Sequence, residues 1–210
     1  MKRLILALML AAPALLIQQS IHAQTTAKKP AAAPPATPKT AAPASKTANA
    51  VPQPQLIMET SKGTITMVLF PDTAPKSVEH ILKLVNSGFY RSQRVHRVVA
   101  GQIVQWGDKR SRDMTQREWW GRGTEGGSGT PIGVAEISKK HLHTKGAVGL
   151  AHMGDPRGAD SQIYITTSAR PNLDGKYTVI GQVTSGMDVV LKLKVEDEIK
   201  NITAKGVPGT

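Results

Sequence analysis

Three short segments of this chain carry polar side chains that suit a reaction without nucleophilic attack. Arg97 lies within residues 95–99, Gln105 follows eight residues later, and Gln162 and Tyr164 lie in the segment 161–165. Together they offer a permanently charged guanidinium, two side-chain amides and a set of apolar neighbours. The set contains no nucleophile beside a base and no cluster of metal ligands. The residue types therefore favour a reaction that makes and breaks no covalent bond, such as rotation about an X-Pro peptide bond.

Composition narrows the classes of partner. The chain has 210 residues and a net charge of +12, and residues 1–55 hold six bases and no acid. The remaining residues therefore contain 21 of the 27 bases and all 15 acids, so their net charge is +6. No dense Lys/Arg run with interleaved aromatic residues is present, so we expect no nucleic-acid partner. The absence of Cys excludes disulfides, a thiol nucleophile and thiolate metal sites.

The N-terminal residues predict export. Residues 1–3 are basic at Lys2 and Arg3, residues 4–17 are apolar, and Ala23 is followed by Gln24. This pattern is typical of a signal peptide over 1–23, cleaved after Ala23. The alternative is an uncleaved membrane anchor. Residues 24–54 are mostly Ala, Pro, Thr and Lys with almost no bulky aliphatic residue, which predicts a disordered linker.

The elements that position the polar residues follow from apolar spacing and turn residues within a domain over 55–210. Short apolar or alternating runs bounded by Gly, Pro, Asn or Asp predict strands over 56–59, 64–69, 95–99, 103–106, 147–153, 162–167, 177–183 and 198–204. Thr73 and Pro75 predict a helix start and Gly88 its end; the apolar face of this helix is formed by Val78, Ile81, Leu82 and Val85. A shorter helix is expected over 187–193, and residues 108–131 are expected to form a long loop. Many short strands with two helices predict a closed antiparallel barrel capped by helices.

An ordered set of motifs between residue 56 and about residue 204 resembles the cyclophilin-type peptidyl-prolyl cis-trans isomerases, of an exported bacterial kind. The motifs are Phe89-Tyr90, Val95-His96-Arg97-Val98-Val99-Ala100-Gly101, Gln105-Trp106-Gly107-Asp108, Gly149-Leu150-Ala151-His152, Ser161-Gln162-Ile163-Tyr164-Ile165, Leu173-Asp174-Gly175-Lys176 and Val179-Ile180-Gly181. The resemblance implies a mainly β fold: a closed eight-stranded antiparallel β-barrel capped by two α-helices, with the site on its outer surface. It also implies an isomerase that needs no cofactor and no metal.

The resemblance carries roles onto individual positions. Arg97 matches the catalytic arginine and Gln105 the glutamine beside it. The positions that match substrate-binding residues are Gln102, Ile103, Ala151, His152, Gln162, Tyr164, Leu173 and Tyr177. Among these, Tyr164 stands where the family usually has a pocket phenylalanine, and Gln102 also replaces a phenylalanine.

A physical reason connects Arg97 to the reaction. Amide resonance gives the peptide bond a rotation barrier of about 18–20 kcal/mol. In the twisted transition state the proline nitrogen becomes pyramidal, and its lone pair can accept a hydrogen bond from Arg97. An interaction made only in the transition state lowers the barrier.

The expected substrates are proline-containing unfolded or flexible polypeptides. We expect the protein to act on them as a monomer, in the periplasm or outside the cell. It would remain tethered to the membrane if the signal were uncleaved. The alternative is a proline-peptide binding module or chaperone with little turnover, because Gln102 and Tyr164 make the pocket less apolar. The basic linker adds a third prediction, weak attachment to an anionic surface.

Two further groups of residues leave alternatives open. His141 and His143 are spaced so that a strand would place them on one face, which fits either a metal site or a polar loop. The pair Trp119-Trp120 fits either a patch that binds a partner or an anchor for the long loop.

Overall fold

The computed structural model describes residues 53–206, which lie within one compact unit. The predicted signal peptide over 1–23 lies outside these residues, and so does the predicted linker over 24–54 except for its last two positions. Pro54 belongs to the folded unit, because it is buried and its carbonyl accepts a hydrogen bond of 2.8 Å from Leu69 N–H. Of the helices formed by the described residues, none has the length and apolar character needed to cross a membrane.

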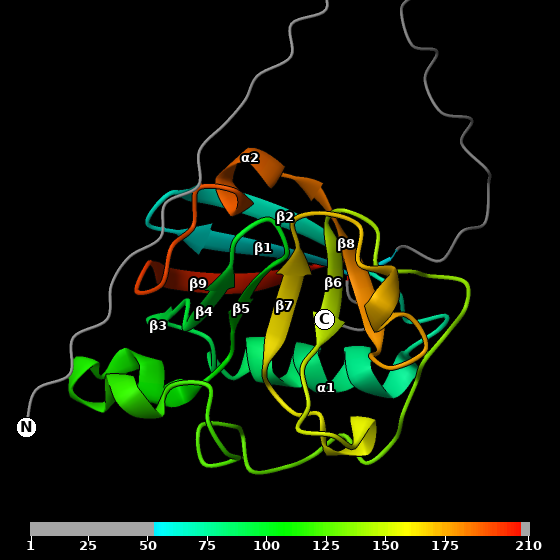
Figure 1. The fold of residues 1–210 in the computed structure, drawn as a ribbon, viewed down its shortest axis with the longest axis horizontal. Coiled ribbons are helices and arrows are strands. Elements are labelled where there is room, and N and C mark those ends of the chain that lie inside the picture. The colour runs from blue at the N-terminus through cyan, green and yellow to red at the C-terminus, as the bar shows by residue number, and fades with distance from the viewer. Residues whose placement is uncertain (1–52, 207–210) are drawn as a thin grey trace, which may run out of the picture. The chain divides into compact units, whose positions relative to one another are not determined.

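One curled antiparallel sheet forms most of the molecule (Figure 1). Its strands are β1 (Gln55–Thr60), β2 (Gly63–Leu69), β3 (Gln93–Arg94), β4 (Arg97–Val99), β5 (Ile103–Trp106), β6 (Ala147–Leu150), β7 (Ile163–Thr166), β8 (Val179–Ser185) and β9 (Glu198–Lys205). The nine strands are hydrogen bonded in the order β3-β9-β1-β2-β8-β6-β7-β5-β4. The mainly β class is therefore confirmed.

The closed eight-stranded barrel is wrong, because the sheet has nine strands and its two end strands, β3 and β4, do not pair. Of the expected strand over 95–99 only residues 97–99 form a strand, β4, and β3 lies just before the expected range. Val95 N–H still bonds toward the β9 side, to Asp197 O at 2.9 Å, whereas His96 N–H bonds to Gln105 O in β5 at 3.1 Å. Val95 and His96 are adjacent in the chain but form hydrogen bonds with opposite ends of the sheet. The two end strands, β3 and β4, are therefore joined by the polypeptide chain itself and not by backbone hydrogen bonds between them.

The core lies inside the curl, where alternate strand residues converge. Leu56 and Met58 of β1 and Ile65, Met67 and Leu69 of β2 are almost inaccessible to solvent, and the residues between them are more exposed. This period of two explains why the sequence pattern predicted these strands.

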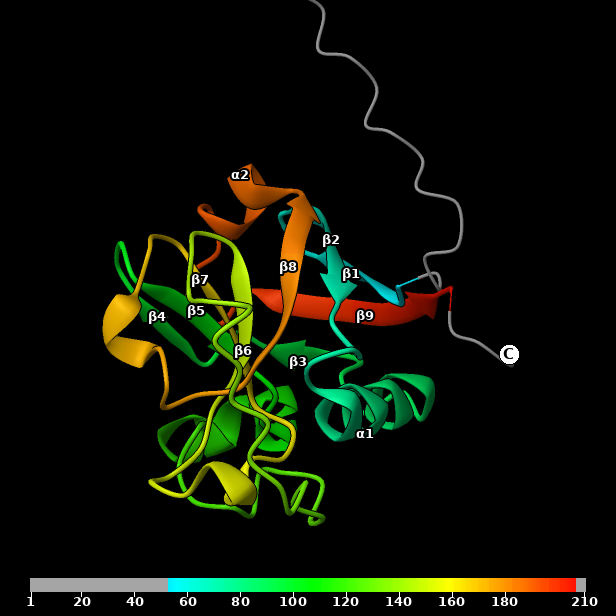
Figure 2. The same ribbon diagram turned by 90° about the vertical axis from the view of Figure 1, so that its right-hand side faces the viewer.

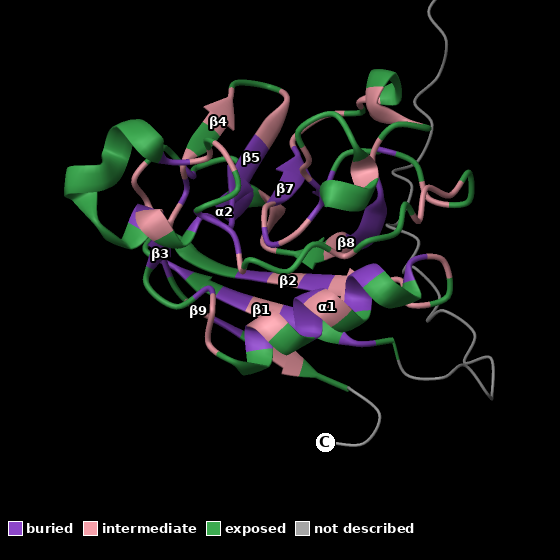
Figure 3. Ribbon diagram, turned by 90° about the horizontal axis from the view of Figure 1, so that it is seen from below, coloured by how far each residue is buried: buried purple, intermediate pink, exposed green. Residues whose placement is uncertain are grey.

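Helix α1 (Pro75–Asn86) packs its apolar stripe on the sheet (Figure 3). The predicted face of Val78, Ile81, Leu82 and Val85 is buried. The predicted Thr73 cap is wrong: Ala74 occupies the cap position and contributes no side-chain hydrogen bond. The carboxylate of Glu136 instead accepts from Lys76 N–H and Ser77 N–H, at 3.0 and 2.8 Å. A residue from a distant loop thus satisfies the free donors at the helix start.

The second helix, α2 (Met187–Val190), is shorter than the expected 187–193. It lies at the opposite end of the curled sheet from α1, as two perpendicular views show (Figures 1 and 2). The helices therefore leave free the outer face of β4, β5, β7 and β6.

The segment 108–131 is more ordered than the loop that was expected. It contains two short 3-10 helices, η1 (Lys109–Arg112) and η2 (Met114–Trp119), and two more follow, η3 (Pro156–Gly158) and η4 (Pro171–Leu173). Asp108 and Asp113 begin η1 and η2 by accepting hydrogen bonds from Arg110 N–H and Thr115 N–H. The hydrogen bonds of these two aspartates fix the backbone conformation at the start of each 3-10 helix in the glycine-rich segment.

Candidate active site

Four residues form a row across the outer face of the sheet. Arg97 of β4 pairs with Gln105 of β5, Gln105 pairs with Tyr164 of β7, and Tyr164 pairs with Gly149 of β6. Directly paired residues on antiparallel strands point to the same face. The register alone therefore brings together residues from four segments of the chain.

Alternation along the strands separates this face from the core. Ile103 lies two residues before Gln105 in β5 and so shares its face, whereas Val104 and Trp106 point into the core and are buried. The same holds in β7, where Ile163 and Ile165 on either side of Tyr164 belong to the core. The core side chains hold the strands in register, and the outer residues are left for binding.

A chain of hydrogen bonds links the three predicted polar residues. Arg97 Nη1–H donates to Gln105 Oε1 at 3.1 Å, and Gln105 Nε2–H donates to Gln162 Oε1 at 2.8 Å. Gln105 is only 7% exposed, whereas Arg97 is exposed to solvent. Among residues 53–206 the Arg97 guanidinium makes this one side-chain hydrogen bond, so most of its N–H donors remain free. We call these three residues the Arg97 chain.

Aromatic rings form the neighbouring part of the site. The Tyr177 ring meets the Tyr164 ring edge-on, with centroids 6.0 Å apart, and stacks on the His152 ring at 4.3 Å. Tyr164 is 3% exposed, and its hydroxyl lies 2.8 Å from His143 Nε2. Burial is the main reason that the pKa of Tyr164 is raised. The hydroxyl therefore stays protonated and is already bonded within the protein.

A cavity of about 700 Å³ adjoins the Arg97 chain. Gln105, Ala151, His152 and Gln162 line it on the sheet side, and its other wall comes from the segments 121–131 and 153–160. Ala151 follows β6, and its N–H bonds to Gln162 O at 2.9 Å. The cavity gives an extended ligand room beside the Arg97 chain, because Gln105 and Gln162 line it.

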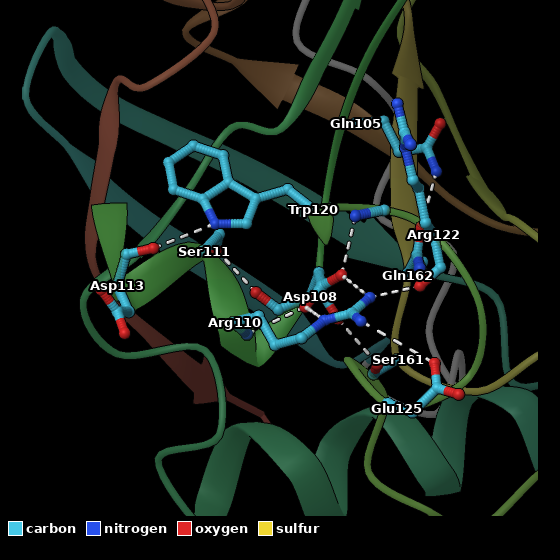
Figure 4. A network of polar contacts seen from close by, with 12 residues as sticks. Gln105, Asp108, Arg110, Ser111, Asp113, Trp120, Arg122, Glu125, Ser161 and Gln162 are labelled. Carbon is cyan, nitrogen blue, oxygen red and sulfur yellow. Dashed lines mark hydrogen bonds and ion pairs between the residues drawn. The ribbon is translucent and has the colours of Figure 1, made fainter. Parts of the chain in front are cut away.

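The buried carboxylate of Asp108 binds Gly121, one of the residues that line the cavity, and Figure 4 shows the polar contacts around it. Asp108 is 0% exposed; its carboxylate accepts from the Arg110 side chain at 2.8 and 3.2 Å and from Gly121 N–H at 2.7 Å, and its carbonyl accepts from Ser111 Oγ–H. Burial alone would raise the pKa of Asp108, but the hydrogen bonds from Arg110 and Gly121 outweigh it and lower the pKa. We call Asp108, Arg110, Ser111 and Gly121 the Asp108 cluster.

His96 packs against Gly121. A Cβ atom added to Gly121 would lie 2.7 Å from the His96 ring, and Gly121 has a φ of +72°. Glycine is therefore required there by both the contact and the backbone. Both ring nitrogens of His96 are buried without a hydrogen-bond partner among the described residues, and burial lowers the pKa of His96 to about 4. This position fits a structural role for His96.

The other predicted binding residues lie around the row. Gln102 is in the turn between β4 and β5, where its carbonyl accepts from Thr167 N–H at 2.8 Å. Leu173 ends η4 and is half-buried. Within residues 53–206 no hydrogen bond joins either side chain to the Arg97 chain, so their substrate roles stay predictions.

The structure distinguishes the two histidines that the sequence left open. His141 stacks on Phe70 with ring centroids 3.7 Å apart, whereas His143 is buried between Asp174 and Tyr164. The described residues contain no group of three His, Cys, Asp or Glu side chains that could hold a metal ion. Sequence reasoning missed the link from His143 to Tyr164, because 21 residues separate them and no local pattern indicates the contact.

The two adjacent tryptophans also differ. Trp120 is 7% exposed and its Nε1–H donates to Asp113 O at 3.2 Å, so it anchors the segment 108–131 (Figure 4). Trp119 is 53% exposed and does not share this role.

Comparisons with known proteins agree on the family. Residues 55–207 match the family described as "Cyclophilin type peptidyl-prolyl cis-trans isomerase/CLD". A "Probable peptidyl-prolyl cis-trans isomerase" of Brucella suis biovar 1 (strain 1330) is 39% identical over 154 residues, which cover 73% of this chain and 78% of that protein. "Peptidyl-prolyl cis-trans isomerase B" of Bacillus subtilis (strain 168) is 34% identical over 142 residues, 68% of this chain and 91% of that protein.

A solved structure supports the fold. The cyclophilin-type peptidyl-prolyl cis-trans isomerase of Cryptosporidium parvum superposes with a TM-score of 0.63 at 24% identity, covering 74% of this chain and 99% of that one. From the family match, the identity to relatives and the shared fold, this chain belongs to the cyclophilin-type peptidyl-prolyl cis-trans isomerases and catalyses rotation about X-Pro peptide bonds.

Proposed function

We propose that Arg97 is the catalytic residue of this isomerase and donates a hydrogen bond to the proline nitrogen as the peptide bond twists. The supporting observation is the exposed guanidinium, which is held from one side by Gln105 and keeps its other donors free. The planar ground-state nitrogen shares its lone pair with the carbonyl and accepts poorly. The bond therefore strengthens as the transition state forms, which lowers the barrier.

Gln105 positions Arg97, and Gln162 binds the substrate backbone. Gln105 is buried and uses its carbonyl oxygen for Arg97 and its amide for Gln162, so its orientation is determined by both neighbours. Gln162 also lines the cavity, together with Ala151, the half-buried residue that follows β6. An extended peptide can lie in this cavity while its proline contacts Ile103 and Tyr164.

The test is the rate of cis/trans exchange of an Ala-Pro peptide, measured by NMR magnetisation transfer with Arg97→Ala. Loss of one preorganised donor is expected to lower kcat by about 100- to 1000-fold. Arg97→Lys is the matched control: it keeps the charge but lacks the planar fork, so we expect it to recover little of the activity. Unfolding by urea should change by less than about 0.5 kcal/mol in both variants, because the side chain is exposed. Exchange at near the parental rate in Arg97→Ala would refute the assignment.

We also propose that this chain is bacterial and exported, and that it acts as a monomer on proline-containing polypeptides that fold in the periplasm or outside the cell. The support is the basic start, the apolar run over 4–17 and the Ala/Pro-rich stretch over 24–54. Uncatalysed proline isomerisation takes tens to hundreds of seconds, so a folding catalyst is useful there. Weak attachment to anionic surfaces through the basic residues of 24–54 is a further part of this proposal.

Expression of the full chain in a bacterial host tests export. Mature protein that begins at Gln24 and is released with the periplasmic fraction is the expected result. A chain that retains residues 1–23 and sediments with membranes would support the uncleaved anchor instead. Binding to vesicles with anionic lipid should fall with added salt and should vanish when residues 24–54 are deleted.

Two residues, Gln102 and Tyr164, suggested the alternative of a binding module without turnover, and only Gln102 still supports it. It relied on the Tyr164 hydroxyl making the pocket polar, but that hydroxyl is bonded to His143. Gln102 remains, and the exchange measurement on the parental protein decides between binding and catalysis.

A further inference from the structure

A buried series of hydrogen bonds leads from Asp174 through His143 to Tyr164. Asp174 Oδ1 lies 2.8 Å from His143 N and 2.7 Å from His143 Nδ1, and His143 Nε2 lies 2.8 Å from the Tyr164 hydroxyl. His143 is 2% exposed. None of these bonds has a part in the proposed action of Arg97.

The chemistry of the three groups assigns a direction to the series. The N–H of the His143 backbone is the main cause of a lowered pKa of Asp174, and its ring adds to this, so the carboxylate is ionised and can only accept. His143 Nδ1 must therefore carry a proton, and this N–H donates a hydrogen bond to the Asp174 carboxylate. When the ring carries this single proton, Nε2 accepts a hydrogen bond from the Tyr164 hydroxyl, which burial keeps protonated.

The other contacts of Tyr164 explain why its hydroxyl needs a partner. The ring lies across Gly149, where an added Cβ would come within 2.4 Å of Cζ and 2.5 Å of the hydroxyl oxygen. Tyr177 meets the ring edge-on. Gln105, its neighbour across the strands, directs its amide groups to Arg97 and Gln162 and so does not hold the ring.

We propose that His143 is a positioning residue for the isomerase site: supported by Asp174, it holds the hydroxyl of Tyr164 and thereby keeps the ring in place as a wall for the substrate proline. This inference rests on the proposed role of the row beside Arg97. An apolar wall contacts the proline ring in the ground state and in the transition state alike. Removing the support should therefore raise KM and leave kcat nearly unchanged.

The experiment compares His143→Leu, Tyr164→Phe and the double variant in peptide exchange over a range of peptide concentrations. Each single variant is expected to raise KM by about three- to tenfold, the equivalent of one lost hydrogen bond, with kcat within about twofold of the parent. The double variant should have the KM of Tyr164→Phe alone, because His143 acts through the hydroxyl. His141→Leu is the matched control: it removes a neighbouring histidine that stacks on Phe70, and it should change neither constant.

Several results would overturn the inference. A purely structural histidine would lower the fraction of active protein, so kcat would fall with KM unchanged, and the two substitutions would add. Tyr164→Phe retains the ring and so keeps the test open if His143→Leu does not fold. The ¹⁵N shifts of His143 give an independent readout, and a ring protonated at Nε2 instead of Nδ1 would contradict the assigned direction. A parental protein without exchange activity would refute the proposed function itself, whereas an active, Arg97-dependent protein with unchanged KM in these variants would refute this inference alone.

Discussion

The Arg97 chain includes Gln105 of β5, and the Asp108 cluster starts two residues after the end of that strand. The two sets of residues differ in how fully their polar groups are bonded. In the Arg97 chain three side chains share two hydrogen bonds, and the guanidinium is exposed. In the Asp108 cluster one inaccessible carboxylate accepts from Arg110 and Gly121, and it is closed off from solvent. Polar groups with spare donors therefore lie on the substrate side, whereas polar groups whose hydrogen bonds are all made within the protein stabilise the scaffold.

The largest effect that the comparison predicts is on stability, at Asp108. Asp108→Ala leaves Arg110 and Gly121 N–H without their acceptor, and it should lower the free energy of unfolding by about 3–5 kcal/mol. Urea unfolding measures this loss. Glu125→Ala is the control, because Glu125 approaches the same arginine only at 3.8 Å with a 75% exposed side chain, and it should cost less than about 1 kcal/mol. Equal losses in the two variants would remove the distinction between the regions.

A smaller effect concerns acid stability and His96. Its pKa is about 4 in the folded protein, chiefly because of burial, against about 6.5 in an unfolded chain. The unfolded state therefore gains protons first, and stability that is fully present above pH 6.5 falls as the pH drops toward 4. The loss from this residue should reach about 2–3 kcal/mol at pH 4.5.

The contribution of His96 is measured from the free energy of unfolding of the parent and of His96→Leu, each at pH 7 and at pH 4.5. The charged groups around the ring are Asp108, whose attraction opposes the shift, and Arg97 and Arg110, which favour the neutral ring. Asp108 has a lowered pKa and so keeps its charge over this range. His96→Leu should lose less stability than the parent between the two pH values, and an identical loss would contradict the buried, unpartnered ring.

The smallest predicted effect lies in the Arg97 chain. Gln105→Leu removes the group that orients Arg97, and kcat should fall by about tenfold, as expected for one hydrogen bond to a charged group. Its free energy of unfolding should change far less than that of Asp108→Ala. Gln116→Leu, on the exposed surface of η2, should retain parental kcat. Full activity in Gln105→Leu would show that Arg97 does not need this support.

Local patterns predicted the elements whose residues interact with near neighbours. β5 occupies the predicted residues 103–106, and the face of α1 is the one expected from its apolar spacing. These predictions are correct because the spacing of apolar residues along the sequence matches the period of a strand or of a helix. The helix cap failed for the opposite reason: Glu136, about 60 residues from the donors it satisfies, replaces the local Thr73.

The site divides in the same way. The residue types of Arg97, Gln105, Gln162 and Tyr164 favoured the class of reaction, and the ordered set of motifs around them predicted the family. The sequence by itself thus determined the strand pattern and the residues available for chemistry, because both depend on short-range spacing and side-chain type. Only the tertiary structure decided that the sheet stays open between β3 and β4, that Trp120 and not Trp119 is buried, and that His143 reaches Tyr164. Those outcomes depend on which distant segments the folded chain brings into contact, and no local period encodes that choice.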